Sequence, residues 1–327
     1  GLGHLRVWSE TPGARVTAVC DGDAARAHDA ARSIGAQPFD DLEDMARSGL
    51  IDAVDICTPS GLHADQGILA ASHGLHVLCE KPLDLCIEKV DRLIEACESR
   101  GLTLAGVFQR RTYPAVQQVA RDIAAGRMGR VLSASAYLKW WRPQSYYDSA
   151  GWRGTWAMDG GVLANQAIHA IDHLVWLAGP VAEVEYARLE TAAHKMEAED
   201  FALAVVRFES GARGVIEATT CCSPDLCSRI EVFGTRGAVA FEDATPVKYG
   251  LDGQDRLPAL PREDGRIGGG SDPMAISLKG HAVIAADFVE AVRERREPLV
   301  PGRVARVSVD ALNKIYRAAL PGVRLGT

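Results

Sequence analysis

Two short motifs in this chain carry side chains that can move a proton and stabilise a negative charge. The first is the tripeptide Glu80-Lys81-Pro82, and the second runs from Gly160-Gly161 to His169. Lys81 supplies a cation for an oxygen that becomes negative, and His169, with an ordinary pKa of about 6.5, can accept a proton near neutral pH. Together they predict a site where a hydroxyl loses its proton while hydride leaves the same carbon.

Lys81 comes at the end of an apolar run, residues 75–79, which is typical of a buried parallel strand. Ligands of open α/β sheets bind beyond the carboxyl ends of the strands, so we expect Lys81 to face a bound molecule. Pro82 restricts the backbone there and stops the strand. The alternative is that Lys81 is a solvated strand-end residue with Glu80 as its partner.

The second motif is expected to be one mostly buried helix over residues 162–177. Asn165, His169 and Asp172 recur in it at helical spacing. Burying these three groups costs several kcal/mol unless each is satisfied by an internal partner or a ligand. A lone histidine here would more often be a satisfied core residue. Three polar groups behind two glycines favour a site, in which Asn165 holds a hydroxyl and Asp172 orients the imidazole or extends its hydrogen-bond chain.

Length and composition predict an ordinary globular protein of two domains. The chain has 327 residues, of which 47% are hydrophobic and 24% charged. Its net charge of -7 opposes binding to nucleic acid or anionic membranes but leaves a small-molecule substrate open. The eight cysteines show no metal-ligand spacing, so we expect no metal and reduced thiols. With no signal peptide or spanning segment in view, a cytoplasmic protein is expected.

Residues 1–109 alternate between short apolar runs and helical patterns, which predicts a doubly wound parallel sheet, a dinucleotide-binding Rossmann domain. Several groups would line the crevice at the carboxyl ends of its strands and bind the cofactor. They are Asp21, Thr58, Pro59, Ser60, His63, Glu80, Lys81 and Gln109. Asp21 would accept hydrogen bonds from the adenosine ribose and repel a 2′-phosphate, which favours NAD over NADP; the alternative is an ordinary turn aspartate.

Residues 110–327 follow a different pattern, in which strands succeed one another and predict a large, open, mostly antiparallel sheet. The helix of the second motif is expected to cover one face. Late helices over residues 282–295 and 306–320 are placed where they can return to the first domain. The open sheet is a natural surface for a homodimer or homotetramer. Residues 250–272, rich in glycine, proline and charge, are expected to form a mobile surface loop.

An aromatic and arginine cluster precedes the second motif. Tyr147, Trp152 and Arg153 belong to it and are expected to contact substrate. Aromatic faces pack on sugar rings, and arginine forks bind phosphate or carboxylate. The alternative is an ordered loop whose tryptophans fill a gap in the core.

These motifs, with the late Asp287-Phe288 helix, resemble the glucose-fructose oxidoreductase, inositol dehydrogenase and rhizopine catabolism (Gfo/Idh/MocA) family over essentially the whole chain. The resemblance implies a Rossmann domain, a C-terminal α/β domain with an open sheet, a tightly held nicotinamide cofactor, and hydride transfer at a carbinol of a sugar, polyol or nucleotide sugar. It places the family's motif lysine at Lys81 and its histidine at His169.

Three features depart from the family pattern. Many members carry an aspartate where this chain has Asn165, which can orient a hydroxyl but cannot take its proton. Many also carry a third glycine at the position of Asp159. The usual glycine fingerprint is absent: Gly1 resembles the last glycine of a Gly-x-Gly-x-x-Gly turn, so the first strand and two glycines either precede residue 1 or are missing.

Two other functions remain open at this point. The same fold also serves glycosidases that oxidise, eliminate and re-reduce their substrate with bound NAD, and these release free sugar without net NADH. A non-catalytic regulator that senses a dinucleotide or sugar is the second alternative. Lys81 and His169 argue against it, because a sensor needs no proton acceptor.

Overall fold

A computed structural model describes residues 1–261 and 277–322 of the chain. The chain divides into two compact units: Gly1–Gln109 with Leu278–Arg306, and Arg110–Ser277 with Val307–Thr327. Each unit therefore contains a late segment of the chain, and the boundary between these segments falls inside one helix, α11 (Gly302–Ala319).

The first unit contains two small parallel sheets. Strands β1 (Ala18–Cys20) and β2 (Gln37–Phe39) form one pair. The other sheet has the order β3-β4-β5, made of β3 (Ala53–Ile56), β4 (His76–Cys79) and β5 (Leu104–Gly106). No strand within the described residues joins the two sheets. The predicted parallel α/β architecture is confirmed.

Six α-helices lie wholly within this unit: α1 (Leu2–Glu10), α2 (Ala24–Ile34), α3 (Leu42–Arg47), α4 (His63–Ser72), α5 (Ile87–Glu98) and α10 (Lys279–Glu294). Local signals fix some of their ends. Asp23 caps α2 by accepting hydrogen bonds from the N–H groups of Ala25 and Arg26, and Gly35 ends it at φ 71°. Although late in the chain, α10 adds Ile284 and Phe288 to a core that also contains Leu78.

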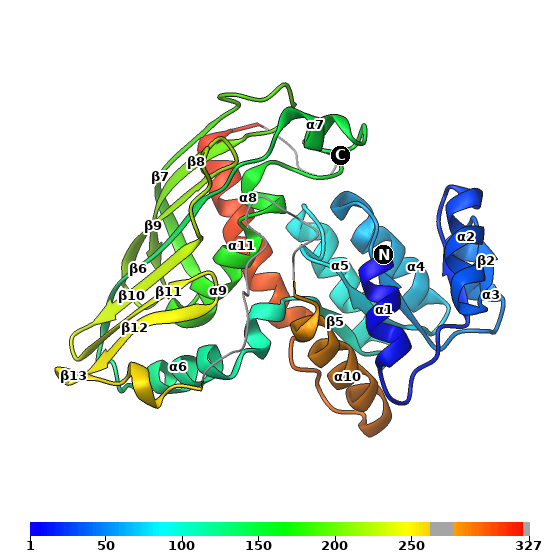
Figure 1. Cartoon of the computed structure of the whole chain (residues 1–327), viewed down its shortest axis with the longest axis horizontal. Coiled ribbons are helices and arrows are strands. Elements are labelled where there is room, and N and C mark those ends of the chain that lie inside the picture. Colours follow the sequence, from blue (N-terminus) through cyan, green and yellow to red (C-terminus); the bar gives the residue numbers. More distant parts are fainter. Residues whose placement is uncertain (262–276, 323–327) are drawn as a thin grey trace. The chain divides into compact units, whose positions relative to one another are not determined.

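The second unit is built on an eight-stranded sheet of order β13-β12-β11-β10-β6-β9-β8-β7. Its strands are β6 (Val131–Lys139), β7 (Val181–Glu190), β8 (Phe201–Phe208), β9 (Arg213–Thr219), β10 (Arg229–Gly234), β11 (Gly237–Glu242), β12 (Thr245–Leu251) and β13 (Gln254–Asp255). All neighbouring pairs are antiparallel except β6 and β9. The predicted large antiparallel sheet is confirmed (Figure 1).

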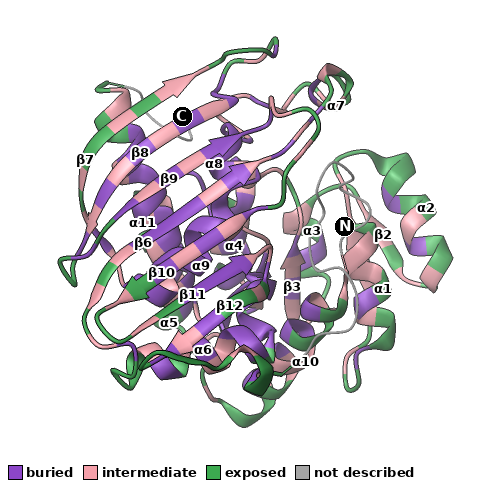
Figure 2. Ribbon diagram, turned by 60° about the vertical axis from the view of Figure 1, so that its left-hand side comes forward, coloured by how far each residue is buried: buried purple, intermediate pink, exposed green. Residues whose placement is uncertain are grey.

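One face of this sheet carries the core of the unit. Along β8, Ala202, Ala204, Val206 and Phe208 are buried and alternate with more exposed residues, as the two-residue period of a strand requires. Figure 2 shows this alternation along the strands. Helices lie on the buried face (Figure 1), and α9 (Ile168–Ala178) packs against β6 and β10. The unit also contains α6 (Pro114–Ala124) and α7 (Gln144–Asp148).

Two predicted segments differ from the structure. The single helix over residues 162–177 is divided into α8 (Val162–Asn165) and α9. At the break, the Ala167 N–H reaches five residues back to Val162 O, at 2.8 Å. The expected surface loop over residues 250–272 begins instead with the end of β12, β13 and a 3₁₀ turn, Leu257–Ala259; residues 262–272 lie outside the described residues.

None of the helices in the described ranges is both long enough and apolar enough to cross a membrane.

Candidate functional site

The candidate cofactor residues lie in the first unit, beginning at the start of α1. This helix, α1, begins directly after Gly1. The first N–H groups of an α-helix attract anions, so this end of α1 suits a diphosphate. The residues present therefore fit the pyrophosphate of a dinucleotide.

Asp21 follows β1 directly, where it was predicted to meet the adenosine ribose. Its Oδ1 accepts hydrogen bonds from the Asp23 N–H at 2.9 Å and from Arg26 Nη2 at 3.0 Å. Within the described residues these contacts use Oδ1 and leave the side chain 39% exposed. A partly exposed carboxylate at this strand end fits a ribose and disfavours a 2′-phosphate.

His63, predicted to belong to the cofactor site, lies inside the first unit. Only 1% of its surface is exposed, and its predicted contact with the cofactor stays a prediction. Its nitrogens lie 2.7 Å from Pro82 O and 2.8 Å from Thr58 O, and burial lowers the pKa of the ring. His63 instead joins the turn after β3, which includes Pro59 and Ser60, to the turn after β4.

Lys81 lies in the turn directly after β4, as predicted, and is half-buried. The Glu80 N–H donates to Ile56 O at 2.9 Å, and the Lys81 N–H donates to Glu80 Oε2 at 2.9 Å. The Glu80 side chain therefore holds the backbone of this turn by accepting the Lys81 N–H. Gln109, the last predicted cofactor residue, is 8% exposed at the end of the unit's first segment.

A separate group of candidate residues lies in the second unit, around α8 and α9. Asn165 ends α8, and His169, half-buried, lies in the first turn of α9. Asn165 Nδ2 donates to Asp159 Oδ1, and Asp159 Oδ2 accepts the Gly154 N–H at 2.9 Å. Asp159, where the family pattern has glycine, thus orients the Asn165 amide.

Asp172 was predicted to contact substrate or to orient His169, and this role stays a prediction. The residue is completely buried, and its two carboxylate oxygens accept hydrogen bonds from Arg111 at 2.9 and 2.8 Å. Ser308 Oγ donates a third at 2.7 Å. Through these partners, Asp172 anchors α9 in the unit.

Glu199 fixes the start of α8. Its backbone oxygen accepts the Val162 N–H at 2.8 Å, and its Oε1 accepts the Leu163 N–H at 3.0 Å and the Tyr316 hydroxyl at 2.9 Å. A Cβ on Gly161 would lie 2.1 Å from Glu199 Oε2, so only glycine allows this approach. Burial raises the pKa of Glu199 to about 7, and these hydrogen bonds only partly oppose the shift.

The predicted aromatic and arginine cluster is assembled within the second unit. The Arg153 guanidinium lies 4.2 Å from the centroid of the Tyr146 ring and 4.6 Å from that of Trp152. Tyr147 is 5% exposed, and its hydroxyl pairs with Thr220 Oγ1 at 2.8 Å. Trp152 and Arg153 are half-buried and remain predicted substrate residues, whereas the Tyr147 hydroxyl has a protein partner.

The sequence reasoning missed three residues that hold this site: Arg111, Asp159 and Glu199. Arg111 had a local signal, since two consecutive arginines follow the end of the predicted Rossmann domain. Asp159 had another, because it immediately precedes the two glycines. Glu199 had none, because only the folded chain brings it to Gly161.

Comparison with known proteins matches both units. Residues 1–108 match the oxidoreductase family with an NAD-binding Rossmann fold, and residues 116–240 match the GFO/IDH/MocA C-terminal domain. An inositol 2-dehydrogenase of Rubrobacter xylanophilus is 31% identical over 239 residues, which is 72% of this chain and 65% of that relative. The matched region is thus just under two thirds of that relative's length.

Two solved structures resemble the chain over nearly its whole length. The WlbA dehydrogenase of Bordetella pertussis, in complex with NADH and UDP-GlcNAcA, is 34% identical, with a TM-score of 0.84 and coverage of 98% of this chain and 94% of that one. The WlbA dehydrogenase of Chromobacterium violaceum, in complex with the same molecules, is 31% identical, with a TM-score of 0.86 and coverage of 99% and 91%. This chain therefore belongs to the Gfo/Idh/MocA family of oxidoreductases, and its first unit is an NAD-binding Rossmann domain.

Proposed function

We propose that this protein oxidises a ring carbinol of a nucleotide-linked N-acetylhexosamine uronate, with NAD as the hydride acceptor. The observation that carries the proposal is the resemblance, at 34% identity over 98% of the chain, to a dehydrogenase crystallised with NADH and UDP-GlcNAcA. The stacked side chains of Arg153, Tyr146 and Trp152 support it, because a guanidinium and aromatic faces suit a carboxylate or phosphate beside sugar and base rings.

The chain's own residues would divide the chemistry as follows. Bound NAD supplies the acceptor for the hydride. His169 takes the hydroxyl proton of the same carbinol as that carbon becomes a carbonyl. Lys81 stabilises the oxygen while it carries negative charge, and Asn165, oriented by Asp159, holds a neighbouring hydroxyl. The partly exposed side chains of Lys81 and His169 suit groups that must contact substrate.

The test is a turnover assay with purified protein. UDP-GlcNAcA, myo-inositol and levoglucosan are each supplied with NAD, and NADH is followed by absorbance. We expect the nucleotide sugar to give the highest kcat/KM. Free sugar without net NADH would contradict the proposal and favour the glycosidase mechanism. NADH formation with inositol or levoglucosan alone would overturn the substrate class.

His169→Ala tests the proposed base. We expect kcat to fall by about 10²- to 10⁴-fold, the usual contribution of a general base, with little change in the Kd of NAD. His28→Ala is the matched control, because His28 is exposed on α2. Wild-type turnover in His169→Ala would remove the histidine from the mechanism.

Two further properties belong to the same proposal. All eight cysteines lie in the described residues as free thiols, which supports a reducing compartment such as the cytoplasm. The open face of the eight-stranded sheet leaves Val205 and Val215 only partly covered, which supports a homodimer or homotetramer formed through this sheet. Light scattering of the purified protein tests the oligomer, and a monomeric mass would overturn it.

A further inference from the structure

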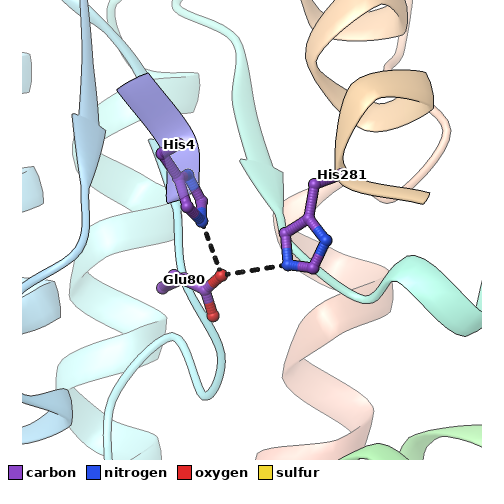
Figure 3. A group of neighbouring side chains, drawn as sticks. All are labelled: His4, Glu80 and His281. Atoms are coloured by element: carbon purple, nitrogen blue, oxygen red, sulfur yellow. Dashed lines mark hydrogen bonds and ion pairs between the residues drawn. The ribbon is translucent and has the colours of Figure 1, made fainter. Parts of the chain in front are cut away.

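Glu80, the neighbour of Lys81, is approached by two histidines from distant parts of the chain. His4 Nε2 lies 2.9 Å from Glu80 Oε1, and His281 Nε2 lies 3.7 Å from the same oxygen. Figure 3 shows the carboxylate between the two rings, His4 from α1 and His281 from α10. All three residues belong to the first unit, where α1 and α10 are packed together.

The second oxygen of Glu80 connects this group to the turn that carries Lys81. Glu80 Oε2 accepts the Lys81 backbone N–H at 2.9 Å. One carboxylate therefore contacts both histidines through Oε1 and the Lys81 backbone through Oε2. Rotation of the Glu80 side chain would break both sets of contacts at once.

His4 lies between two carboxylates. Its Nδ1 is 2.7 Å from Asp55 Oδ2, and the same oxygen accepts the Trp8 indole N–H at 2.5 Å. Because carboxylate oxygens only accept, each ring nitrogen of His4 must carry a proton to bond both, so the ring is a cation. In the resulting network, Asp55 and Glu80 are balanced by His4 and the Lys81 ammonium.

The electrostatics agree with this geometry. Burial alone would lower the pKa of His4, but hydrogen bonds to Asp55, Cys57 and Glu80 outweigh it and raise that pKa far above its ordinary value. Burial alone would raise the pKa of Glu80. Hydrogen bonds from His281 and His4 and the charges of His4 and Lys81 overcome it and hold the pKa well below its usual range. Both groups are therefore charged at neutral pH.

We propose that His4 and His281 are positioning residues that act through Glu80 to fix the direction in which Lys81 leaves the end of β4. The functional part of this inference rests on the proposed hydride transfer. An ammonium stabilises a developing alkoxide only where it is held in advance, and a misplacement of about 1 Å can cost roughly 10²-fold in rate. The His4, Glu80 and His281 group supplies that support from α1 and α10.

The first test needs no substrate. In protein labelled with nitrogen-15 histidine, we expect one of the nine rings to keep both protons at about pH 8.5, roughly two units above the ordinary histidine pKa, and this signal to vanish in His4→Gln. A histidine spectrum with no doubly protonated ring would overturn the charged network. Stoichiometric zinc in the purified protein, lost in His281→Gln, would also overturn it, because His4, Glu80 and His281 have ligand atoms within 4.8 Å of one another.

The second test asks whether the histidines act through Lys81. We expect His4→Gln and His281→Gln each to lower kcat by about 10- to 100-fold with the Kd of NAD within about twofold, and neither to lower residual turnover further in a Lys81→Ala background. His28→Gln, on an exposed surface, should change nothing. Equal losses with and without Lys81, or no loss of kcat, would contradict the proposal.

Chemical labelling separates failure of this inference from failure of the proposed function. Acetylation of Lys81 by limiting acetic anhydride is measured by peptide mass spectrometry, with the exposed Lys248 as internal reference. We expect the Lys81 to Lys248 ratio to change at least about threefold in His4→Gln, because the ammonium loses its fixed surroundings. An unchanged ratio would overturn the positioning role even if no sugar proves to be a substrate.

Discussion

The turn that carries Lys81 and the α8–α9 segment that carries His169 are each held by one glutamate, in opposite ways. Glu80 is ionised, accepts from the His4 imidazole and from a backbone N–H, lies near the His281 imidazole, and has its pKa held low. None of the partners of Glu199 among the described residues is a cation, because its carboxylate accepts hydrogen bonds from a tyrosine hydroxyl and a backbone N–H. Burial raises the pKa of Glu199 to about 7. One segment is held by charge, and the other by packing against Gly161.

The largest expected effect comes from breaking the buried ion pair that anchors α9. Arg111→Ala leaves Asp172, completely buried, without its counter-charge, so we expect unfolding free energy to fall by about 3–5 kcal/mol. Denaturant titration measures it. Arg236→Ala is the matched control, because the Arg236 and Asp252 side chains are 59% and 55% exposed, and an exposed pair contributes about 1 kcal/mol or less. Equal losses in both variants would refute the anchoring role of Asp172.

The elements of the first unit could be predicted because their signals are local. The apolar run at residues 75–79 became β4, and Asp23 caps α2 within three residues. The strand end therefore placed Lys81 correctly. The network behind it could not be predicted, because His4 lies 76 residues from Glu80 and nothing local couples them.

The second motif was predicted less well, because the residues that hold it are also distant in the sequence. Its helical spacing is real, but the pattern could not reveal that Glu199 fixes the first turn or that the helix restarts after Ala167. Nor could it show that Arg111, 61 residues away, bonds Asp172. The polar groups on one stripe of the helix indicated that each needs a hydrogen-bond partner. Whether that partner is another residue or a ligand depends on the fold, which the sequence pattern does not show.

Gly161→Ala tests the packing side of the comparison. The added Cβ would lie 2.1 Å from Glu199 Oε2 and 2.2 Å from its backbone oxygen, and backbone cannot move aside easily. We expect unfolding free energy to fall by about 3 kcal/mol, together with activity, since α8 and the Asn165 amide must shift. In Gly151→Ala the Cβ meets nothing within 4 Å, so thermal and denaturant unfolding should stay close to wild type. Wild-type stability in Gly161→Ala would show that Glu199 does not fix α8.

The two glutamates should respond to pH in opposite directions. The folded pKa of Glu199 is raised to about 7, so its contribution to stability is present at low pH and lost as pH rises. We expect the unfolding free energy of the wild type to fall by about 2 kcal/mol between about pH 5 and 7 for this reason. Glu199→Gln, which cannot ionise, should not show this fall. Because the pKa of Glu80 is lowered, its contribution is present above about pH 4.3 and lost as pH falls. Denaturant titrations of Glu199→Gln and Glu80→Gln across this range measure the difference from wild type. Slopes of the same sign would break the comparison.

The smallest expected effect concerns Asp21, where charge acts on a ligand and not on the fold. Its carboxylate is 39% exposed, so solvent screens it far more than Glu80 or Glu199. We expect Asp21→Asn to lower the preference for NAD over NADP by roughly tenfold, about 1.4 kcal/mol, because the 2′-phosphate loses a repelling charge while Arg26 remains beside it. Calorimetric Kd values for both dinucleotides measure this without a substrate, and Asp29→Asn, exposed on the same helix as Arg26, is the control. If Asp21→Asn leaves the preference for NAD over NADP unchanged, that preference must come from other residues of the first unit. The role of charge in this unit would then be limited to the Glu80 contacts that hold the Lys81 turn.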